Sequence, residues 1–426
     1  MDNEFQVSLY DMVWCVSNTI DLISPTLFGH HARTAFIAAA IAEEHGLSFY
    51  SQRNVMLAGL LHDVGALSLQ DRLSCLTFED DSRGDHAHCG YFLLNSFHPL
   101  APIASLVRYH HQKWQDGAGE FIDGQPISPL CHILHLADRI DALIDKKREI
   151  LGQIPKVIEI VEKKSGLMFV PDIVKTAKRL AKKESFWFDV TSSALTCRYL
   201  SEKFRAETIF LDIDVLLELT KTIVRIIDFR CRFTATHSSG VAMTATALGE
   251  LYGLSPFDLK KLRIAGDLHD LGKLAIPAEI LHKPERLSAE EFNTIKKHPY
   301  YTYRILESVT GLDSIPEWAA FHHERLNGGG YPFNFNQDQI NVGSRIISVA
   351  DVFTALTEDR PYRSGLRKEG VAAILKPMSS NKDLDSEIVD LLFDHYEEID
   401  EKRRNAQIEA KQEYEKFTEL SRNKAA

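Results

Sequence analysis

Two similar stretches decide the architecture of this chain: FGHHARTAFIAAAIAEEHGLS at 28–48 and ATHSSGVAMTATALGELYGLS at 235–255. Their alignment pairs His30 with His237, and both stretches end in Gly-Leu-Ser. In the second stretch, apolar residues recur at helical spacing up to Gly253, a residue type that suits the end of a helix. The chain therefore contains an internal duplication, and helices carry its first paired histidines.

The duplication continues through a series of histidines and aspartates. Leu61-His62-Asp63 aligns with Leu268-His269-Asp270, and Tyr109-His110-His111 aligns with Phe321-His322-His323. Five His and two Asp recur in the same order in each copy, so ten of the 18 histidines belong to the two sets. The first set is His30, His62, Asp63, His86, His110, His111 and Asp138, and the second set is His237, His269, Asp270, His298, His322, His323 and Asp351.

The hydrophobic periodicity predicts an all-α fold. Segments 5–20 and 211–227 carry apolar residues at helical spacing, and strand-like alternation is nearly absent. The segment 146–205 has a helical pattern with Lys- and Glu-rich faces, which we interpret as the tail of the first domain plus a connector. We predict two tandem helical bundles, 1–205 and 206–426, joined by a helical connector, with a charged helix at the C-terminal end.

The composition is that of a globular, acidic chain. Hydrophobic residues make up 44% of the 426 residues, so each half can bury a core. The net charge of −11 disfavours binding to DNA or RNA polymers, which requires a basic surface. Six scattered cysteines without a Cys-X-X-Cys motif argue against a disulfide framework and fit a reducing cytoplasm. No apolar stretch approaches the ~18 residues of a membrane helix, so we expect no membrane partner.

The second set of His and Asp predicts metal chemistry. Imidazole and carboxylate ligands together suit Fe, Mn, Zn or Ni better than Mg or Ca alone. Seven ligands exceed the needs of one tetrahedral ion and suit two ions, if one carboxylate bridges them. Two ions about 3.5–4 Å apart can activate a water and stabilise the oxygens of a phosphoryl displacement. A helical bundle with a central metal site could hold such a set.

The second copy resembles the HD-GYP family, a subgroup of the HD metal-dependent phosphohydrolases. The matching segments are His-Asp-Leu-Gly-Lys at 269–273 followed by Ile276-Pro277, Lys-Lys-His-Pro at 296–299, His-His-Glu-Arg-Leu-Asn-Gly-Gly-Gly-Tyr-Pro at 322–332, Val-Ala-Asp at 349–351 and Asp-Arg-Pro-Tyr-Arg at 359–363. The resemblance covers about residues 210–400. It implies hydrolysis of a cyclic dinucleotide in a bacterium, chiefly c-di-GMP and in some relatives 3′,3′-cGAMP.

The order of the two domains is similar to that of cyclic GMP-AMP phosphodiesterases that place an HD domain before the HD-GYP domain. This moves the expected substrate from c-di-GMP towards 3′,3′-cGAMP. The resemblance implies a cytoplasmic signalling enzyme that opens the ring to a linear 5′-phosphorylated dinucleotide. The alternative is a receptor that binds the cyclic dinucleotide without turnover.

The resemblance also implies a role for each residue of this site. The seven members of the second set hold two divalent transition metals, Fe, Mn or Ni, with Asp270 as the bridge, and Lys273 contacts the scissile phosphate. The substrate-binding residues are Arg360, Arg363, Gly330, Tyr331 and Pro332. The two arginines hold the non-reacting phosphate, and the Gly-Tyr-Pro loop shapes the substrate entrance.

Two positions depart from the family pattern. Phe233 stands where some relatives carry a Glu that adds a third metal, so we expect two metals. The usual Asp-Gly of the loop is Asn327-Gly328, and the effect of this change stays open.

The first copy keeps all seven of its ligands but lacks the other motifs. Ala66 stands where the second copy has Lys273, and neither a Gly-Tyr-Pro loop nor an Arg-Pro-Tyr-Arg string is present. One interpretation is a second phosphohydrolase, with further metals, that acts as a 5′-nucleotidase on the linear product. The other is a regulatory or dimerising domain, which would make the chain a homodimer.

Overall fold

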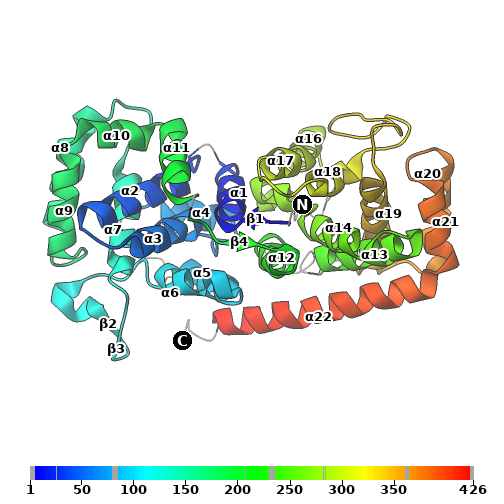
Figure 1. Cartoon of the computed structure of the whole chain (residues 1–426), viewed down its shortest axis with the longest axis horizontal. Helices are drawn as coiled ribbons and strands as arrows, with labels where there is room; N and C mark the ends of the chain where they lie inside the picture. The colour runs from blue at the N-terminus through cyan, green and yellow to red at the C-terminus, as the bar shows by residue number, and fades with distance from the viewer. Residues whose placement is uncertain are drawn as a thin grey trace. The chain divides into compact units, whose positions relative to one another are not determined.

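The structure is a computed structural model that describes residues 5–24, 26–78, 85–205, 207–229, 236–281, 283, 285–359 and 364–422. These residues are almost wholly helical, which confirms the predicted all-α class (Figure 1). The chain divides into two compact units. We call residues 9–209 the N-terminal unit, and residues 210–420 together with the residues up to Ser8 the C-terminal unit.

The N-terminal unit contains eleven α-helices, three short 3₁₀ helices and one two-stranded hairpin among its described residues. In chain order they are α1 (Leu9–Asp21), α2 (His30–Glu44), α3 (Phe49–Leu61), α4 (Leu69–Cys75), α5 (Asp85–Asn95), η1 (His98–Leu100), α6 (Ala101–Arg108), η2 (Gln115–Glu120), β2 (Phe121–Ile122), β3 (Gln125–Pro126), α7 (Leu130–Leu143), η3 (Leu151–Gln153), α8 (Ile154–Lys163), α9 (Pro171–Ala181), α10 (Glu184–Thr191) and α11 (Ser193–Phe204).

The C-terminal unit begins with the only strand pair described in it. In chain order its elements are β1 (Val7–Ser8), β4 (Phe210–Leu211), α12 (Ile213–Asp228), α13 (His237–Tyr252), α14 (Pro256–Leu268), η4 (Leu271–Ala275), α15 (Ala278–Leu281), α16 (Ala289–Ile295), α17 (Lys297–Leu306), α18 (Ile315–Ala320), η5 (Phe321–His323), α19 (Val342–Thr357), α20 (Lys368–Ser380), α21 (Ser386–Asp394) and α22 (Tyr396–Arg422). Strand β1 pairs antiparallel with β4, so the chain's N-terminal strand belongs to the unit formed by its second half.

Helix ends follow local chemistry in both units. Ser48 and Ser255 cap α3 and α14 by accepting hydrogen bonds from backbone N–H groups of the first turn. Gly253 ends α13 in the left-handed conformation, as its position after the apolar stripe predicts. Ser288 and Glu291 form a reciprocal capping box at the start of α16.

The same close helix contact occurs in both units. A Cβ added at Gly59 of α3 would lie 2.6 Å from the Cα of Ala35 in α2, and a Cβ added at Gly266 of α14 would lie 2.6 Å from the Cα of Ala242 in α13. Only glycine permits this approach. It brings the end of the second helix, where the His-Asp pair lies, close to the start of the first helix and its histidine.

The helices of 146–205 pack onto the N-terminal unit. The Tyr199 hydroxyl donates to Glu43 at the end of α2 over 2.8 Å, and the rings of Tyr199 and Phe186 pack against Phe36. The described residues between α11 and β4, 205 and 207–209, are not helical. The predicted connector region is therefore mostly part of a folded unit.

The charged C-terminal helix predicted from the sequence is α22, drawn in red in Figure 1. Phe417 is buried on it and packs against the ring of Phe229, 5.0 Å between centroids. In the part of the chain that the structure describes, none of the helices combines the length and apolarity needed to span a membrane.

Candidate metal centres

The C-terminal unit gathers all seven members of the second His/Asp set. Six of them lie at or near helix ends, namely the start of α13, the residues after α14, the start of α17 and the 3₁₀ helix η5, and Asp351 lies in the middle of α19. Ligand atoms within 4.8 Å of one another form three overlapping groups: His237 with His269 and Asp351, His298 with His322 and His323, and His269 with Asp270 and His322. One cluster of imidazole and carboxylate groups therefore links five separate elements.

Asp270 lies between the two ends of this cluster. Its Oδ2 is 3.2 Å from Nε2 of His269, and its Oδ1 is 3.4 Å from Nε2 of His298. At one end, Nε2 of His237 is 3.2 Å from Oδ1 of Asp351. The two oxygens of one carboxylate thus face different histidines, which is the arrangement that a bridging ligand requires.

Backbone carbonyls orient three of these imidazoles. Nδ1 of His269 donates to the carbonyl of Gly266 over 2.8 Å, and Nδ1 of His298 and of His322 donate likewise to carbonyls three residues earlier over 2.7 Å. Each bond leaves Nε2 as the nitrogen that faces the cluster. Burial lowers the pKa of His298 to about 3 and that of His322 to about 4, so both imidazoles are neutral near pH 7.

His237 differs because a carboxylate orients it. Its Nδ1 lies 3.1 Å from Oε2 of Glu358, which follows α19. Burial alone would lower the pKa of His237, but Glu358 and Asp351 outweigh it and raise that pKa to about 10. Gln407 of α22 lies 3.4 Å from the same Glu358 oxygen. A carboxylate on the far nitrogen is the usual outer partner of a metal-ligating histidine, so Glu358 fits that role for His237.

Buried atoms without hydrogen bonds indicate that a cation fits both clusters. Nε2 of His269 has no hydrogen-bond partner among the described residues, and the same holds in the N-terminal unit for Oδ1 of Asp63, Nε2 of His110 and Oδ1 of Asp138. An unsatisfied buried polar atom costs about 1–3 kcal/mol. A metal ion would satisfy these lone pairs, and the donor set of imidazoles and carboxylates matches a transition metal.

The predicted substrate residues are only partly described. The Lys273 ammonium forms an ion pair with Oδ2 of Asp270 and keeps about a quarter of its side chain exposed (26%). The Tyr331 ring packs on the ring of His323 with centroids 4.8 Å apart. Pro332 follows in the same loop. A Cβ on Gly330 would lie 2.4 Å from the backbone nitrogen of Arg325, so this position requires glycine. The predictions for Arg360, Arg363 and Phe233 concern residues outside the described ones.

Glu324 is a residue whose role the sequence analysis missed. It directly follows the two histidines, and its carboxylate, 3% exposed, accepts hydrogen bonds from the backbone N–H of Phe333 over 2.7 Å and of Phe335 over 2.9 Å. Glu324 therefore holds the loop that carries Tyr331. Its position next to His323 in the motif was the available signal, but the local sequence did not show which backbone groups it binds.

The N-terminal unit gathers the first set in the same way. Two groups of ligand atoms share Asp63: one with His30 and His62, the other with His86, His110 and His111. Asp138 lies 3.6 Å from Nε2 of both His30 and His62. Oδ2 of Asp63 faces His62 at 3.4 Å, and Oδ1 faces His86 at 3.4 Å. Asp63 thus has the position that Asp270 has in the other unit.

The surroundings of this second cluster differ. Ala66 is fully buried where the C-terminal unit has Lys273. Arg139, 1% exposed, pairs with Asp138 and donates to the carbonyl of Cys75 over 2.7 Å. Asp141 accepts from Arg33 over 2.5 Å and lies 2.7 Å from Nδ1 of His30. Sequence alignment alone did not reveal Arg139 or Asp141, because neither has a counterpart of the same type in the second copy.

Comparison with known proteins agrees with this duplication. Two models of the HD domain match the chain, one over residues 27–143 and the other over residues 221–388. The chain is 31% identical to the 3′3′-cGAMP-specific phosphodiesterase 1 of Vibrio cholerae over 399 residues, which are 91% of this chain and 92% of that protein. The chain belongs to the HD-domain family of cyclic-dinucleotide phosphodiesterases. It is therefore an HD-family hydrolase, and the expected metal dependence of this family agrees with the two His/Asp clusters.

A second relative agrees with this membership, and a solved structure shares the fold. The chain is 32% identical to the 3′3′-cGAMP-specific phosphodiesterase 3 of V. cholerae over 276 residues, 64% of this chain and 59% of that protein. The crystal structure of the cyclic GMP-AMP phosphodiesterase V-cGAP3 of V. cholerae superposes with a TM-score of 0.63 at 21% identity, covering 91% of this chain and 97% of that chain. This structural match shows that the chain and V-cGAP3 share one fold.

Proposed function

We propose that the C-terminal unit opens a cyclic dinucleotide, with 3′,3′-cGAMP preferred over c-di-GMP. Water adds to one phosphorus, the bond from that phosphorus to the ribose 3′ oxygen breaks, and the oxygen leaves as a hydroxyl. The product is a linear dinucleotide with a 5′-phosphate. The observation that carries the proposal is the largely buried cluster of seven ligands with Asp270 between its two ends. The preference for cGAMP is supported by the name of the relative that matches 91% of the chain.

The seven ligands of this unit would hold two divalent transition metals, Fe, Mn or Ni. When bound, such a pair supplies Lewis acidity to activate water and to stabilise charge on phosphate oxygens. Asp270 is the proposed bridge, because its two oxygens face different histidines. Lys273 would place its ammonium at the reacting phosphate, since it already lies against Asp270.

The remaining substrate contacts are assigned from the motifs. Tyr331 would present its ring to a base, because that ring packs beside His323 at the edge of the cluster. Arg360 and Arg363 would hold the phosphate that does not react.

The domain limits of 1–205 and 206–426 remain part of this proposal. The net charge of −11 supports a small nucleotide rather than a nucleic-acid polymer as the partner, and scattered free cysteines support a cytoplasmic location.

Chromatography of reaction products tests the ring-opening proposal. The full chain is incubated with 3′,3′-cGAMP or c-di-GMP, in Mn²⁺ or Fe²⁺, and the linear product is quantified. We expect Asp270→Ala to abolish product formation, and Lys273→Ala to lower kcat by one to two decades, which corresponds to about 1.5–3 kcal/mol. Asp390→Ala, at an exposed position, is the control. Binding of the cyclic dinucleotide without product under either metal would favour a receptor instead.

A second activity is proposed for the N-terminal unit: removal of the 5′-phosphate from the linear product. Its seven ligands cluster around Asp63, while Ala66 replaces the lysine and the Gly-Tyr-Pro loop is absent. Such a site would hold a terminal phosphate of a linear nucleotide better than a ring. Bound metals would supply the same Lewis acidity there.

Release of inorganic phosphate tests the second activity. Wild-type protein should convert the phosphorylated linear dinucleotide to its dephosphorylated form, and Asp63→Ala should make the phosphorylated form accumulate without slowing ring opening. If wild type releases no phosphate under any metal and Asp63→Ala changes the rate of ring opening, the unit is regulatory. If Asp63→Ala changes the molecular mass in solution from that of a dimer to that of a monomer, the unit is dimerising.

A further inference from the structure

A cavity in the N-terminal unit lies apart from its metal cluster. It has a volume of about 340 Å³ and is lined from one side by α3. None of the seven His/Asp ligands of the unit lines it. Cavities of ~300–1,000 Å³ are typical of small-molecule sites, so this one is at the small end of the range. Its size suits a ligand no larger than a mononucleotide rather than a cyclic dinucleotide.

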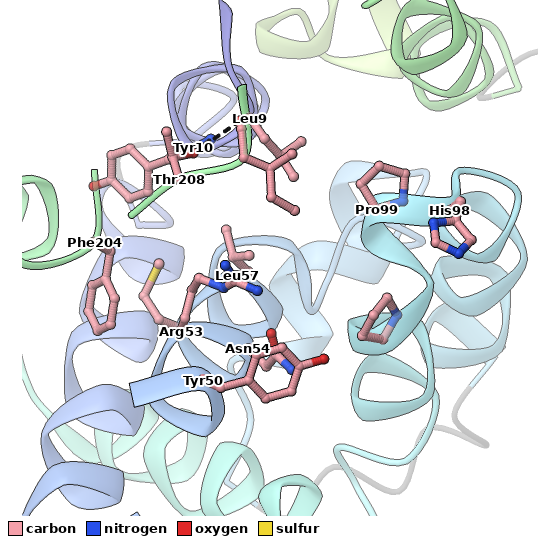
Figure 2. A pocket seen from close by; sticks show the side chains of 13 residues that line it. Leu9, Tyr10, Tyr50, Arg53, Asn54, Leu57, His98, Pro99, Phe204 and Thr208 are labelled. Carbon is pink, nitrogen blue, oxygen red and sulfur yellow. Dashed lines mark hydrogen bonds between the residues drawn. The ribbon is translucent and has the colours of Figure 1, made fainter. Parts of the chain in front are cut away.

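One face of α3 supplies the polar side of this cavity. Tyr50, Arg53, Asn54 and Leu57 follow the helical spacing of one face, and Figure 2 shows their side chains together at one side of the cavity. The Tyr50 ring is 57% exposed, and the Arg53 guanidinium lies over it, 5.3 Å from the ring centroid. The ring therefore remains accessible for stacking with a flat ligand.

Asn54 and Arg53 bring polar groups to the wall of the cavity. Asn54 is 7% exposed and lines the cavity beside Arg53. The buried Nε of Arg53 has no hydrogen-bond partner among the described residues, and its guanidinium forms no ion pair with a described carboxylate. Its Nη1 donates to the carbonyl of Glu207 over 3.5 Å. Buried polar groups in native proteins are nearly always paired, so the unpaired Nε of Arg53 indicates a ligand.

The opposite walls are mainly apolar, with the His98 imidazole and the Tyr10 hydroxyl as polar groups, and are held in place. His98, Pro99 and Pro102 line one of them. Leu9 and Tyr10 line another, where the backbone N–H of Leu9 donates to the carbonyl of Ile209 over 2.9 Å. Apolar walls with a few convergent polar groups are the usual composition of a ligand site.

We infer that this cavity is a nucleotide site separate from both metal clusters and binds an adenine 5′-mononucleotide. A side-chain amide offers a donor and an acceptor side by side, which pairs with N6 and N7 of adenine. Tyr50 supplies the ring on which the base stacks. Arg53, an arginine without a carboxylate partner, supplies charge-assisted hydrogen bonds to the phosphate.

Equilibrium dialysis with AMP tests this inference on the full chain, in EDTA so that neither metal cluster retains the phosphate, and at a temperature below the unfolding transition of the chelated protein. We expect saturable binding of AMP, and at least tenfold weaker binding of adenosine and of GMP. Arg53→Met and Asn54→Leu should each weaken AMP binding about tenfold or more. Because Asn54 is buried, thermal unfolding monitors the fold of its variant, and Asn54→Asp provides a second variant of equal shape that lacks the donor and repels the phosphate.

Arg108→Met is the matched control, since Arg108 also lies over tyrosine rings of this unit, at 4.9 and 5.1 Å, but does not line the cavity. It should bind AMP like wild type. The inference is overturned if wild type shows no saturable binding below about 1 mM, if Arg53→Met binds as tightly as wild type, or if Arg108→Met loses as much affinity. Equal binding of adenosine or GMP overturns it as well. None of these results depends on turnover, so they are separate from the tests of ring opening.

Discussion

At the scale of single residues, Glu358 is predicted to position a metal ligand. Its carboxylate lies 3.1 Å from Nδ1 of His237 and fixes which nitrogen faces the cluster. Loss of such an outer partner typically costs 10–100-fold in metal affinity. We expect Glu358→Ala to bind metal about 10–100-fold more weakly in competition with a chelator. Glu358→Gln should restore part of this affinity. Glu369→Ala, at an exposed position of α20, should retain metal like wild type. Equal retention by all three variants would contradict the assignment.

His132 is predicted to make the folded state sensitive to acid. Both of its ring nitrogens are buried without hydrogen-bond partners among the described residues, and burial lowers its pKa below the ordinary 6.5. Below about pH 6.5 the unfolded chain therefore binds a proton that the folded chain does not, so this group removes stability as the pH falls. His132→Phe keeps a ring against Trp114; in the wild type the centroids of the His132 and Trp114 rings are 5.5 Å apart.

Thermal unfolding at two pH values checks this prediction. The unfolding temperature of His132→Phe minus that of wild type should be larger at pH 5 than at pH 8. His98→Phe, at an exposed site, should show the same difference at both pH values. A pH-independent difference for His132→Phe would show that its titration does not contribute to stability.

At the scale of elements, the two tight helix pairs decide where the ligands lie. Gly266→Ala would place a methyl group 2.6 Å from the Cα of Ala242, so α13 and α14 must separate. We expect a loss of about 1–3 kcal/mol of unfolding free energy, larger than the ~1 kcal/mol that alanine gains over glycine in a helix. Metal retention should fall as well, because α13 starts with His237.

The control Gly370→Ala in α20 meets only the side chain of Leu366, at 3.3 Å and beyond. It should change both the unfolding free energy and the metal retention little. Denaturant unfolding and metal analysis measure them.

At the scale of the whole molecule, both units should depend on metal for stability. Each buries a cluster of imidazoles and carboxylates around one aspartate, and a ligand that binds only the folded state at 100 times its Kd adds about 2.7 kcal/mol. We expect a chelator to lower the unfolding temperature of wild type. Asp63→Ala and Asp270→Ala should each show a smaller chelator effect, and the double variant none. A chelator effect unchanged by Asp63→Ala would mean that the N-terminal cluster holds no metal. Calorimetry with and without chelator makes the comparison.

The sequence by itself determined the duplication, the helical class and the two sets of His and Asp, because helical periodicity and the order of residues along the chain are local properties. It also led to the family through the contiguous string from His322 to Pro332. Only the tertiary structure decided which histidines share Asp270, that Glu324 holds the loop, and that α22 reaches Glu358 through Gln407. These contacts join residues far apart in the chain, so they depend on how helices pack. The pairing of β1 with β4 and the place of Asn54 in the wall of the cavity were invisible for the same reason.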